Sequence, residues 1–223
     1  MSDTELELAQ LLCTRLCHDL AGPVGAVAAG VELIGGDPSQ VDMETLGLIG
    51  NSSAAAALKL KFMRAALGAS GGASGDPKAL LDGYLDAIAG PTGKPTITWP
   101  SAEDLAAGAA ALGGAWLQTL LNLCLLGLET QPSSRALSLQ ITRSPDFTIL
   151  IDVRGVEGRA ALVREDLLAA VAGRVPPALS AKTVHGNLAG RLVRAAGGSV
   201  ELAASGNVVT VTAKFPQSAG TPS

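Results

Sequence analysis

Apolar residues recur at alternating spacings of three and four along the first third of this 223-residue chain. The first series contains Leu6, Gln10, Cys13, Cys17, Leu20, Val24, Val27, Val31 and Ile34. The second contains Leu46, Ile49, Ser53, Ala56, Leu60, Met63 and Leu67. This spacing predicts two long helices with one apolar stripe each, the first ending at about residue 34 and the second over about 40–67. Between them, Gly35-Gly36-Asp37-Pro38-Ser39 has the residues that end a helix and form a turn, so we expect a helical hairpin.

A single hairpin leaves much of its apolar surface in water. Pairing two hairpins into a four-helix bundle removes that surface from solvent, so the pattern predicts a homodimer. The alternative is a monomer in which a second domain covers the hairpin.

The remainder of the chain has the composition of a separate α/β domain. Residues 69–77 are rich in glycine, serine and alanine and predict a flexible linker. We therefore divide the chain into a hairpin (1–68), the linker, an α/β domain (78–217) and a tail (218–223). The domain is expected to hold helices near 78–89, 112–129, 161–172 and 184–196, and strands at 96–99, 136–142, 147–153, 199–204 and 207–215. Helices set against a mixed or antiparallel sheet predict an α/β sandwich.

Composition excludes several classes of protein. The net charge is −4 and no long basic run occurs, which argues against nucleic-acid binding. No apolar run reaches the roughly 18 residues of a membrane span. The first residues are acidic, where a signal peptide is basic, so we expect a cytoplasmic protein. The three cysteines, Cys13, Cys17 and Cys124, form no disulfide framework or metal-ligand cluster, and we expect all three to pack in apolar cores.

His18 is one of only two histidines in the chain. It follows the apolar position Cys17 by one residue, about 100° around the helix, and therefore flanks the apolar stripe. Its own face carries Thr14, Gly22 and Gly25, so small residues leave room for a bulky partner on the C-terminal side. Such a histidine is a candidate phosphoryl acceptor, and the alternative is an ordinary boundary residue.

The phosphoacceptor box of histidine kinases consists of a histidine, an acid, a leucine, two residues, a proline and an apolar residue. Residues 18–24 of this chain closely resemble it. Residues 15–19, Arg-Leu-Cys-His-Asp, more narrowly resemble the ChpT family of bacterial histidine phosphotransferases. Residues 192–201 resemble the last helix and strand of the kinase ATPase domain. The resemblance implies a dimerising hairpin followed by an α/β sandwich of that ATPase type.

The segments that resemble the kinase nucleotide-binding boxes are incomplete. Asn122 matches one asparagine of the Asn box, but Leu126 stands where the second is expected. No aspartate occupies the adenine-binding position near residues 154–158, and residues 183–186 lack most of the last glycine box. We therefore expect neither a nucleotide-binding nor a metal-binding site in this chain.

The resemblance implies a phosphorelay intermediate. His18 would accept a phosphoryl group as nucleophile, and Asp19 would orient its ring or take its proton. The donors and acceptors would be aspartates on receiver domains of a hybrid histidine kinase and of response regulators. Mg²⁺ would come with the receiver, and the chain would hold no cofactor of its own. The alternatives are an ATP-dependent histidine kinase and a non-catalytic dimeric adaptor.

Cationic side chains should offset phosphoryl charge near the acceptor. Arg15 lies one turn before His18, and the hairpin register puts Lys59 opposite, while Gly22 leaves space for the receiver. In the second domain Arg159 and Arg164, with Arg154, are candidates for receiver docking. For each cation the alternative is an ordinary solvated surface charge. His185 has no acidic neighbour in the sequence, and we expect it to be structural.

Overall fold

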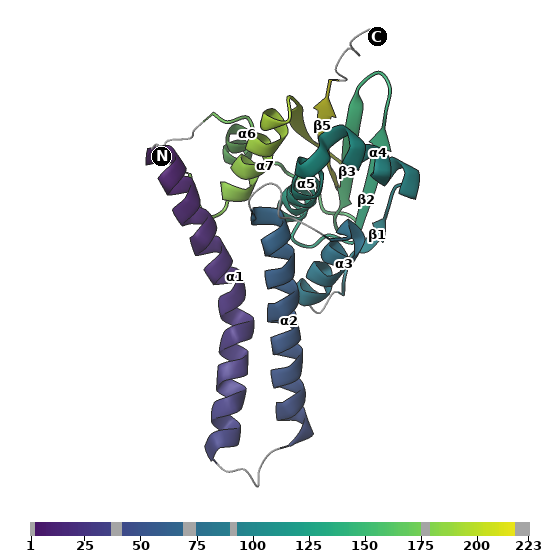
Figure 1. Ribbon diagram of the computed structural model, residues 1–223. Helices are drawn as coiled ribbons and strands as arrows, with labels where there is room; N and C mark the ends of the chain where they lie inside the picture. Colours follow the sequence, from purple (N-terminus) through teal and green to yellow (C-terminus); the bar gives the residue numbers. More distant parts are fainter. Residues whose placement is uncertain (1–2, 37–41, 69–74, 90–92, 175–178, 217–223) are drawn as a thin grey trace.

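The computed structural model describes residues 3–36, 42–68, 75–89, 93–174 and 179–216. Within these ranges the chain forms two long helices that project from a mixed helix-and-sheet unit (Figure 1). The predicted tail and residues 69–74 of the predicted linker lie outside the described residues.

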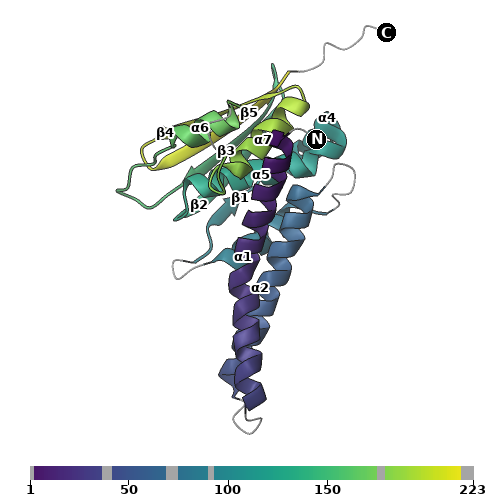
Figure 2. The same cartoon turned by 90° about the vertical axis from the view of Figure 1, so that its left-hand side faces the viewer.

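Helices α1 (Asp3–Gly36) and α2 (Met43–Leu67) run side by side and antiparallel, as the two orthogonal views show (Figure 2). Asp42 begins α2 because its carboxylate accepts a hydrogen bond of 2.6 Å from the Thr45 amide. Near the tip of the hairpin, Gly30 is buried against Ile49, and a Cβ at position 30 would collide with that side chain. The two predicted helices are therefore confirmed, and glycine allows their close approach.

The sheet has five strands in the order β1-β2-β3-β5-β4. They are β1 (Thr96–Thr98), β2 (Ala136–Thr142), β3 (Phe147–Arg154), β4 (Ser199–Ser205) and β5 (Val208–Phe215). Strand β1 pairs parallel to β2, and the other pairs are antiparallel. The mixed sheet predicted from the sequence is confirmed, with strand ends within about two residues.

Helices cover one face of this sheet, because alternate strand residues such as Ile149 and Ile151 are buried while their neighbours are accessible. The helices are α3 (Pro77–Ile88), α4 (Ala102–Leu112), α5 (Trp116–Thr130), α6 (Glu165–Val171) and α7 (Val184–Ala195), with a 3₁₀ turn η2 (Gly113–Ala115). Helix α5 is central: it packs on β3, β5, α2 and α7, and nearly all of its residues are buried.

Two helix predictions need correction. The helix expected over 112–129 is two helices, because the chain bends at Gly113, whose φ of +53° suits glycine. Helix α4 before this bend was missed, although Ser101 caps it by accepting a hydrogen bond of 3.1 Å from the Asp104 amide. The helix expected near 161–172 is shorter and spans Glu165–Val171.

The stretch Ala102–Thr130 has the length and apolar composition of a membrane-crossing helix, and it is the one such stretch among the described residues. It consists of α4, η2 and α5, and 61% of its most apolar window is buried inside the fold. Its apolar character is accounted for by its position in the core.

The cysteine prediction holds for Cys124, which is fully buried, and is wrong for Cys13 and Cys17, which are exposed in the single chain. The reason is the rotation of α1. The helix turns another face toward the rest of the molecule, with Leu16 packed against the main core and Gly30 against α2.

Candidate functional site

The N-terminal half of α1 is docked on the sheet unit. Leu8 is buried in a small cluster with Leu179 and Val184, and Leu11 and Leu12 pack against it. Figure 1 shows this half of α1 beside α7, while its other half extends with α2 away from the sheet. His18 follows the last of these docking residues, Leu12, by about two turns of the same helix, so the docking fixes where the acceptor candidate stands.

His18 points into solvent, with 83% of its side chain exposed. Its Nδ1 atom lies 3.4 Å from Oδ1 of Asp19. One and two turns further along α1, a Cβ built on Gly22 or Gly25 meets nothing within 4 Å. A large partner can therefore approach the imidazole from this side.

Asp19 is held in place by two cations. Its Oδ2 atom accepts a hydrogen bond of 3.1 Å from Nε of Arg15, one turn earlier on α1. Lys59 of α2 donates a hydrogen bond of 3.1 Å to the backbone carbonyl of Asp19. The structure thus places Arg15 and Lys59, both singled out from the sequence, next to the His18–Asp19 pair.

Arg15 also reaches the sheet unit. Its Nη2 atom lies 3.3 Å from Oε1 of Glu129 on α5, and its Nη1 donates to the carbonyl of Ala181 at 3.3 Å. Although partial burial lowers it, the Glu129 and Asp19 carboxylates raise the pKa of Arg15 above its ordinary value. Glu129 also pairs with His185, at 2.7 Å from Nδ1. The sequence prediction missed Glu129, and the acidic partner of His185 lies 56 positions away along the chain.

A groove of about 440 Å³ opens beside Asp19. It is lined by the cations Arg15, Lys59, Arg164 and Lys182, by the carboxylates of Asp19 and Glu129, and by Tyr84 among others. Burial, and the nearby carboxylates, raise the pKa of the Tyr84 hydroxyl, so it stays neutral. The groove therefore offers fixed positive charge close to the acceptor candidate.

The two arginines proposed for docking lie in different hollows. Arg164 lines the groove and forms a bidentate pair with Asp166, at 2.6 and 2.9 Å. Arg159 lines a second hollow of about 620 Å³ at the end of the sheet, together with Arg135 and Arg154. The three arginines proposed together for receiver docking thus lie on two separate surfaces, Arg154 and Arg159 on one and Arg164 on the other.

The residues that resemble nucleotide-box residues take part in packing. Asn122 is fully buried, and its amide donates to the carbonyls of Ala66 (2.7 Å) and Gln118 (2.8 Å). Gln118 in turn donates to the carbonyl of Gly68 at 2.8 Å. Both amides of α5 therefore satisfy carbonyl groups at the end of α2. His185 is 2% exposed, and a Cβ on Gly186 would collide with Leu167.

Within the described ranges, no three histidine, cysteine, aspartate or glutamate side chains gather as ligands for a metal ion. The carboxylates of Asp19 and Glu129 are instead joined through the Arg15 guanidinium.

Comparison with known proteins identifies the family. Residues 75–208 match the family model for the histidine phosphotransferase C-terminal domain. The chain belongs to the histidine phosphotransferase family. It is 33% identical to the protein phosphotransferase ChpT of Brucella abortus (strain 2308) over 156 residues, covering 67% of this chain and 68% of that protein. A solved structure of a bacterial phosphotransferase superposes with a TM-score of 0.72 at 26% identity, covering 96% of this chain and 97% of that one. The predicted resemblance to ChpT-type proteins is confirmed.

Proposed function

We propose that this protein relays a phosphoryl group between aspartates of receiver domains through a phosphohistidine at His18, without using ATP. One observation carries the proposal: an exposed histidine paired with a carboxylate stands beside a cationic groove. Family membership supports a phosphotransferase of a phosphorelay.

The pair of His18 and Asp19 suits nucleophilic attack. A carboxylate only accepts hydrogen bonds, so the proton shared with Asp19 belongs on Nδ1 of His18, which leaves the Nε2 lone pair free in solvent. Nε2 attacks the phosphorus of an aspartyl phosphate, an N–P bond forms, and the O–P bond breaks with its electrons leaving on the aspartate. Asp19 stabilises the positive ring. In the second transfer a receiver carboxylate attacks the phosphorus and the N–P bond breaks.

The charges around the acceptor suit this chemistry. Phosphoryl transfer is catalysed mainly by positioning and by fixed positive charge. Arg15 and Lys59 supply such charge beside Asp19, and Gly22 leaves the approach open. The proposed Mg²⁺ belongs to the receiver, where it would hold the transferring oxygens, and this chain would contribute no cofactor.

We propose a homodimer assembled through the hairpin. Part of the apolar stripe of α1 stays at the surface of the single chain, with Leu6 45%, Val24 55% and Val31 54% exposed. Leu46 and Leu60 of the α2 stripe are 45% and 44% exposed. Apolar surface of this extent marks an interaction site, and a second copy with the same stripes fits it. His18, beside the stripe, would remain accessible on each flank.

The proposed partners are receiver domains of a hybrid histidine kinase and of response regulators. Receivers are acidic around their phosphorylated aspartate, which suits a groove lined by Arg164 and, further away, the surface around Arg159. We propose a cytoplasmic location, with no nucleic-acid or membrane partner, in keeping with the net charge of −4.

Two alternatives make different predictions. An ATP-dependent kinase needs a nucleotide site. Asn122, the residue that matches the kinase Asn box, instead donates its side-chain amide to two backbone carbonyls. A non-catalytic adaptor would bind receivers but would not need His18.

The test is transfer of label from a phosphorylated receiver to the purified chain without ATP. Wild type should gain acid-labile, base-stable label, and His18→Gln should gain none. Asp19→Asn should slow labelling about 100-fold or more. Labelled ATP without a receiver should label neither protein. Equal labelling of His18→Gln would overturn the acceptor assignment, and labelling by ATP alone would favour the kinase.

A further inference from the structure

We infer that Glu129 is a positioning residue for phosphotransfer, acting on the acceptor through Arg15 and Asp19. The inference rests on the proposed function, because it assumes that His18 is the acceptor. Glu129 lies on α5 in the sheet unit and does not touch His18, so any effect on transfer must pass through the intervening side chains.

Glu129 is anchored from its own domain. Nδ1 of His185 lies 2.7 Å from Oε1 of Glu129, and the His185 side chain is 2% exposed. Since a carboxylate only accepts, His185 donates from Nδ1, and its Nε2 atom is left buried without a hydrogen-bond partner in the described structure. A buried ring with one orphaned nitrogen costs stability. Within the described residues, the contact with the Glu129 carboxylate is the one hydrogen bond that the His185 ring makes.

Arg15 transmits this fixed position to α1. Its guanidinium meets three acceptors on three segments: Glu129 on α5, the Ala181 carbonyl before α7, and Asp19 on its own helix. A planar guanidinium held in three directions has little rotational freedom. Since Nε of Arg15 binds Oδ2 of Asp19, the other oxygen, Oδ1, is turned toward His18. The orientation of the acceptor pair is therefore set from the sheet unit.

The charge of Glu129 matters as well as its position. Arg15 lies between two carboxylates, so part of its positive charge is balanced before any phosphoryl group arrives. Without Glu129, Arg15 would be free to leave Asp19 for the incoming phosphoryl group, and Asp19 would lose its fixed orientation. Misplacing a catalytic group by a fraction of an ångström slows a reaction without weakening substrate binding in proportion.

The experiment measures phosphotransfer from a labelled phospho-receiver to the full-length chain over a range of receiver concentrations. Glu129→Gln should lower the maximal rate about 10- to 100-fold, while the half-saturating receiver concentration changes by less than about threefold. Glu103→Gln is the matched control, since Glu103 also pairs with an arginine, at 3.1 Å, but on exposed α4. It should leave both parameters unchanged.

A double-mutant cycle then separates positioning from a general structural role. If Glu129 acts through Arg15, Glu129→Gln should add little to the loss already caused by Arg15→Met. The ¹⁵N spectrum of His18 should also show loss of the fixed Nδ1–H tautomer in Glu129→Gln. If that variant does not fold, Glu129→Asp replaces it, and its maximal rate should fall for the same reason.

Three results for Glu129→Gln would overturn the inference. They are an unchanged maximal rate, a change only in the half-saturating receiver concentration, or a loss that is fully additive with that of Arg15→Met. Failure of the proposed function looks different. In that case wild type itself gains no label, or His18→Gln gains as much as wild type, whatever Glu129 does.

Discussion

The hairpin and the sheet unit differ in whether the polar side chains that resemble family motifs are exposed to solvent or buried. In the sheet unit, Asn122 and His185 occupy segments that resemble nucleotide-binding boxes, yet both are buried and bonded to protein groups. In the hairpin, His18 and its neighbours Gly22 and Gly25 face solvent. A family resemblance in the sequence therefore identifies a chemical site only where the side chain remains free to meet a ligand.

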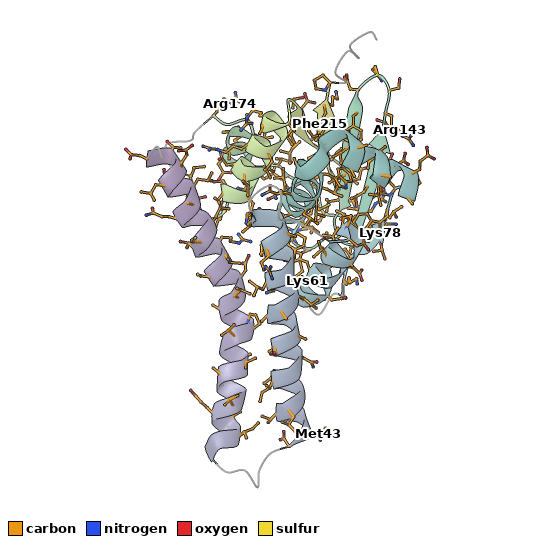
Figure 3. All side chains as sticks on the ribbon, in the orientation of Figure 1. Met43, Lys61, Lys78, Arg143, Arg174 and Phe215 are labelled. Carbon is orange, nitrogen blue, oxygen red and sulfur yellow. The ribbon has the colours of Figure 1, made fainter. Side chains whose placement is uncertain are left out.

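The two regions also differ in how they are stabilised. The sheet unit has a continuous core from α3, α5 and the strands. Phe62 of α2 stacks on Tyr84 of α3, with 4.2 Å between the ring centroids. Figure 3 shows side chains crowded there and sparse along the far half of the hairpin, around Met43. We expect the sheet unit to depend on its own core and the hairpin to depend on a second copy. Four substitutions test this contrast.

The largest effect is expected for Val24→Glu, in the exposed stripe of α1. If two hairpins pack through this stripe, the dimer buries two unpaired carboxylates, each costing several kcal/mol. The dissociation constant should rise at least about 100-fold, measured by sedimentation. Leu162→Glu is the control, because Leu162 is 77% exposed in the sheet unit and should not affect assembly. A dimer unaffected by Val24→Glu would argue against this interface.

Next in size is Leu81→Ala in α3, at a fully buried position of the main core. Removing the side chain should lower the free energy of unfolding by about 2–5 kcal/mol through lost burial and a cavity. Urea unfolding of the protein measures this, and phosphotransfer per folded molecule should stay at the wild-type level. A selective loss of transfer in the folded fraction would show that the core is coupled to the acceptor.

Gly22→Trp should act on the approach to His18. The space around this position is open, so the indole should not disturb the fold but should obstruct a docking receiver. The rate of transfer at low receiver concentration should fall about 10- to 100-fold, as expected when a substitution weakens the binding of the receiver. Gly22→Ala is the control: it raises helix propensity by about 1 kcal/mol and should leave transfer intact. Normal transfer by the tryptophan variant would place the receiver elsewhere.

The smallest effect is expected for Asn122→Ala. Loss of its hydrogen bonds to Ala66 and Gln118 should lower the free energy of unfolding by about 1–3 kcal/mol. Transfer between receivers should be unchanged, because the side chain serves packing between α2 and α5. Comparing thermal unfolding with the transfer rate separates the two roles. Loss of transfer without loss of stability would show that Asn122 contributes to transfer beyond packing.

Local patterns predicted much of the fold. The hairpin followed from apolar spacing, and the strands around Ser144-Pro145-Asp146 followed from alternation and turn residues. The direction of the stripes did not follow, because α1 has two apolar faces. Gly30 faces α2, whereas Val24 and Val31 stay outside. Helix α4 was missed because its alanines gave no periodic signal, although Ser101 and Asp104 had the spacing of a helix cap.

The site was only partly predictable. His18, Asp19 and Arg15 lie within two turns of one helix, and the hairpin register supplied Lys59. Glu129 could not be predicted, because its contacts to Arg15 and His185 join segments far apart in the sequence. A glutamate at the end of an apolar helix resembles any solvated terminus until the tertiary structure brings α1 to it.

The seating of Leu8, Leu11 and Leu12 on Leu179 and Val184 ties α1 to the start of α7. Because α1 is held in this way, each receiver that docks as proposed would meet the same surface around His18. If the protein relays phosphoryl groups as proposed, the rate of transfer should follow the frequency of encounter, so the abundance of each competing receiver should set its share of the phosphoryl flux. Under that proposal, synthesis of more of one receiver should strengthen its signalling branch without any change in this protein.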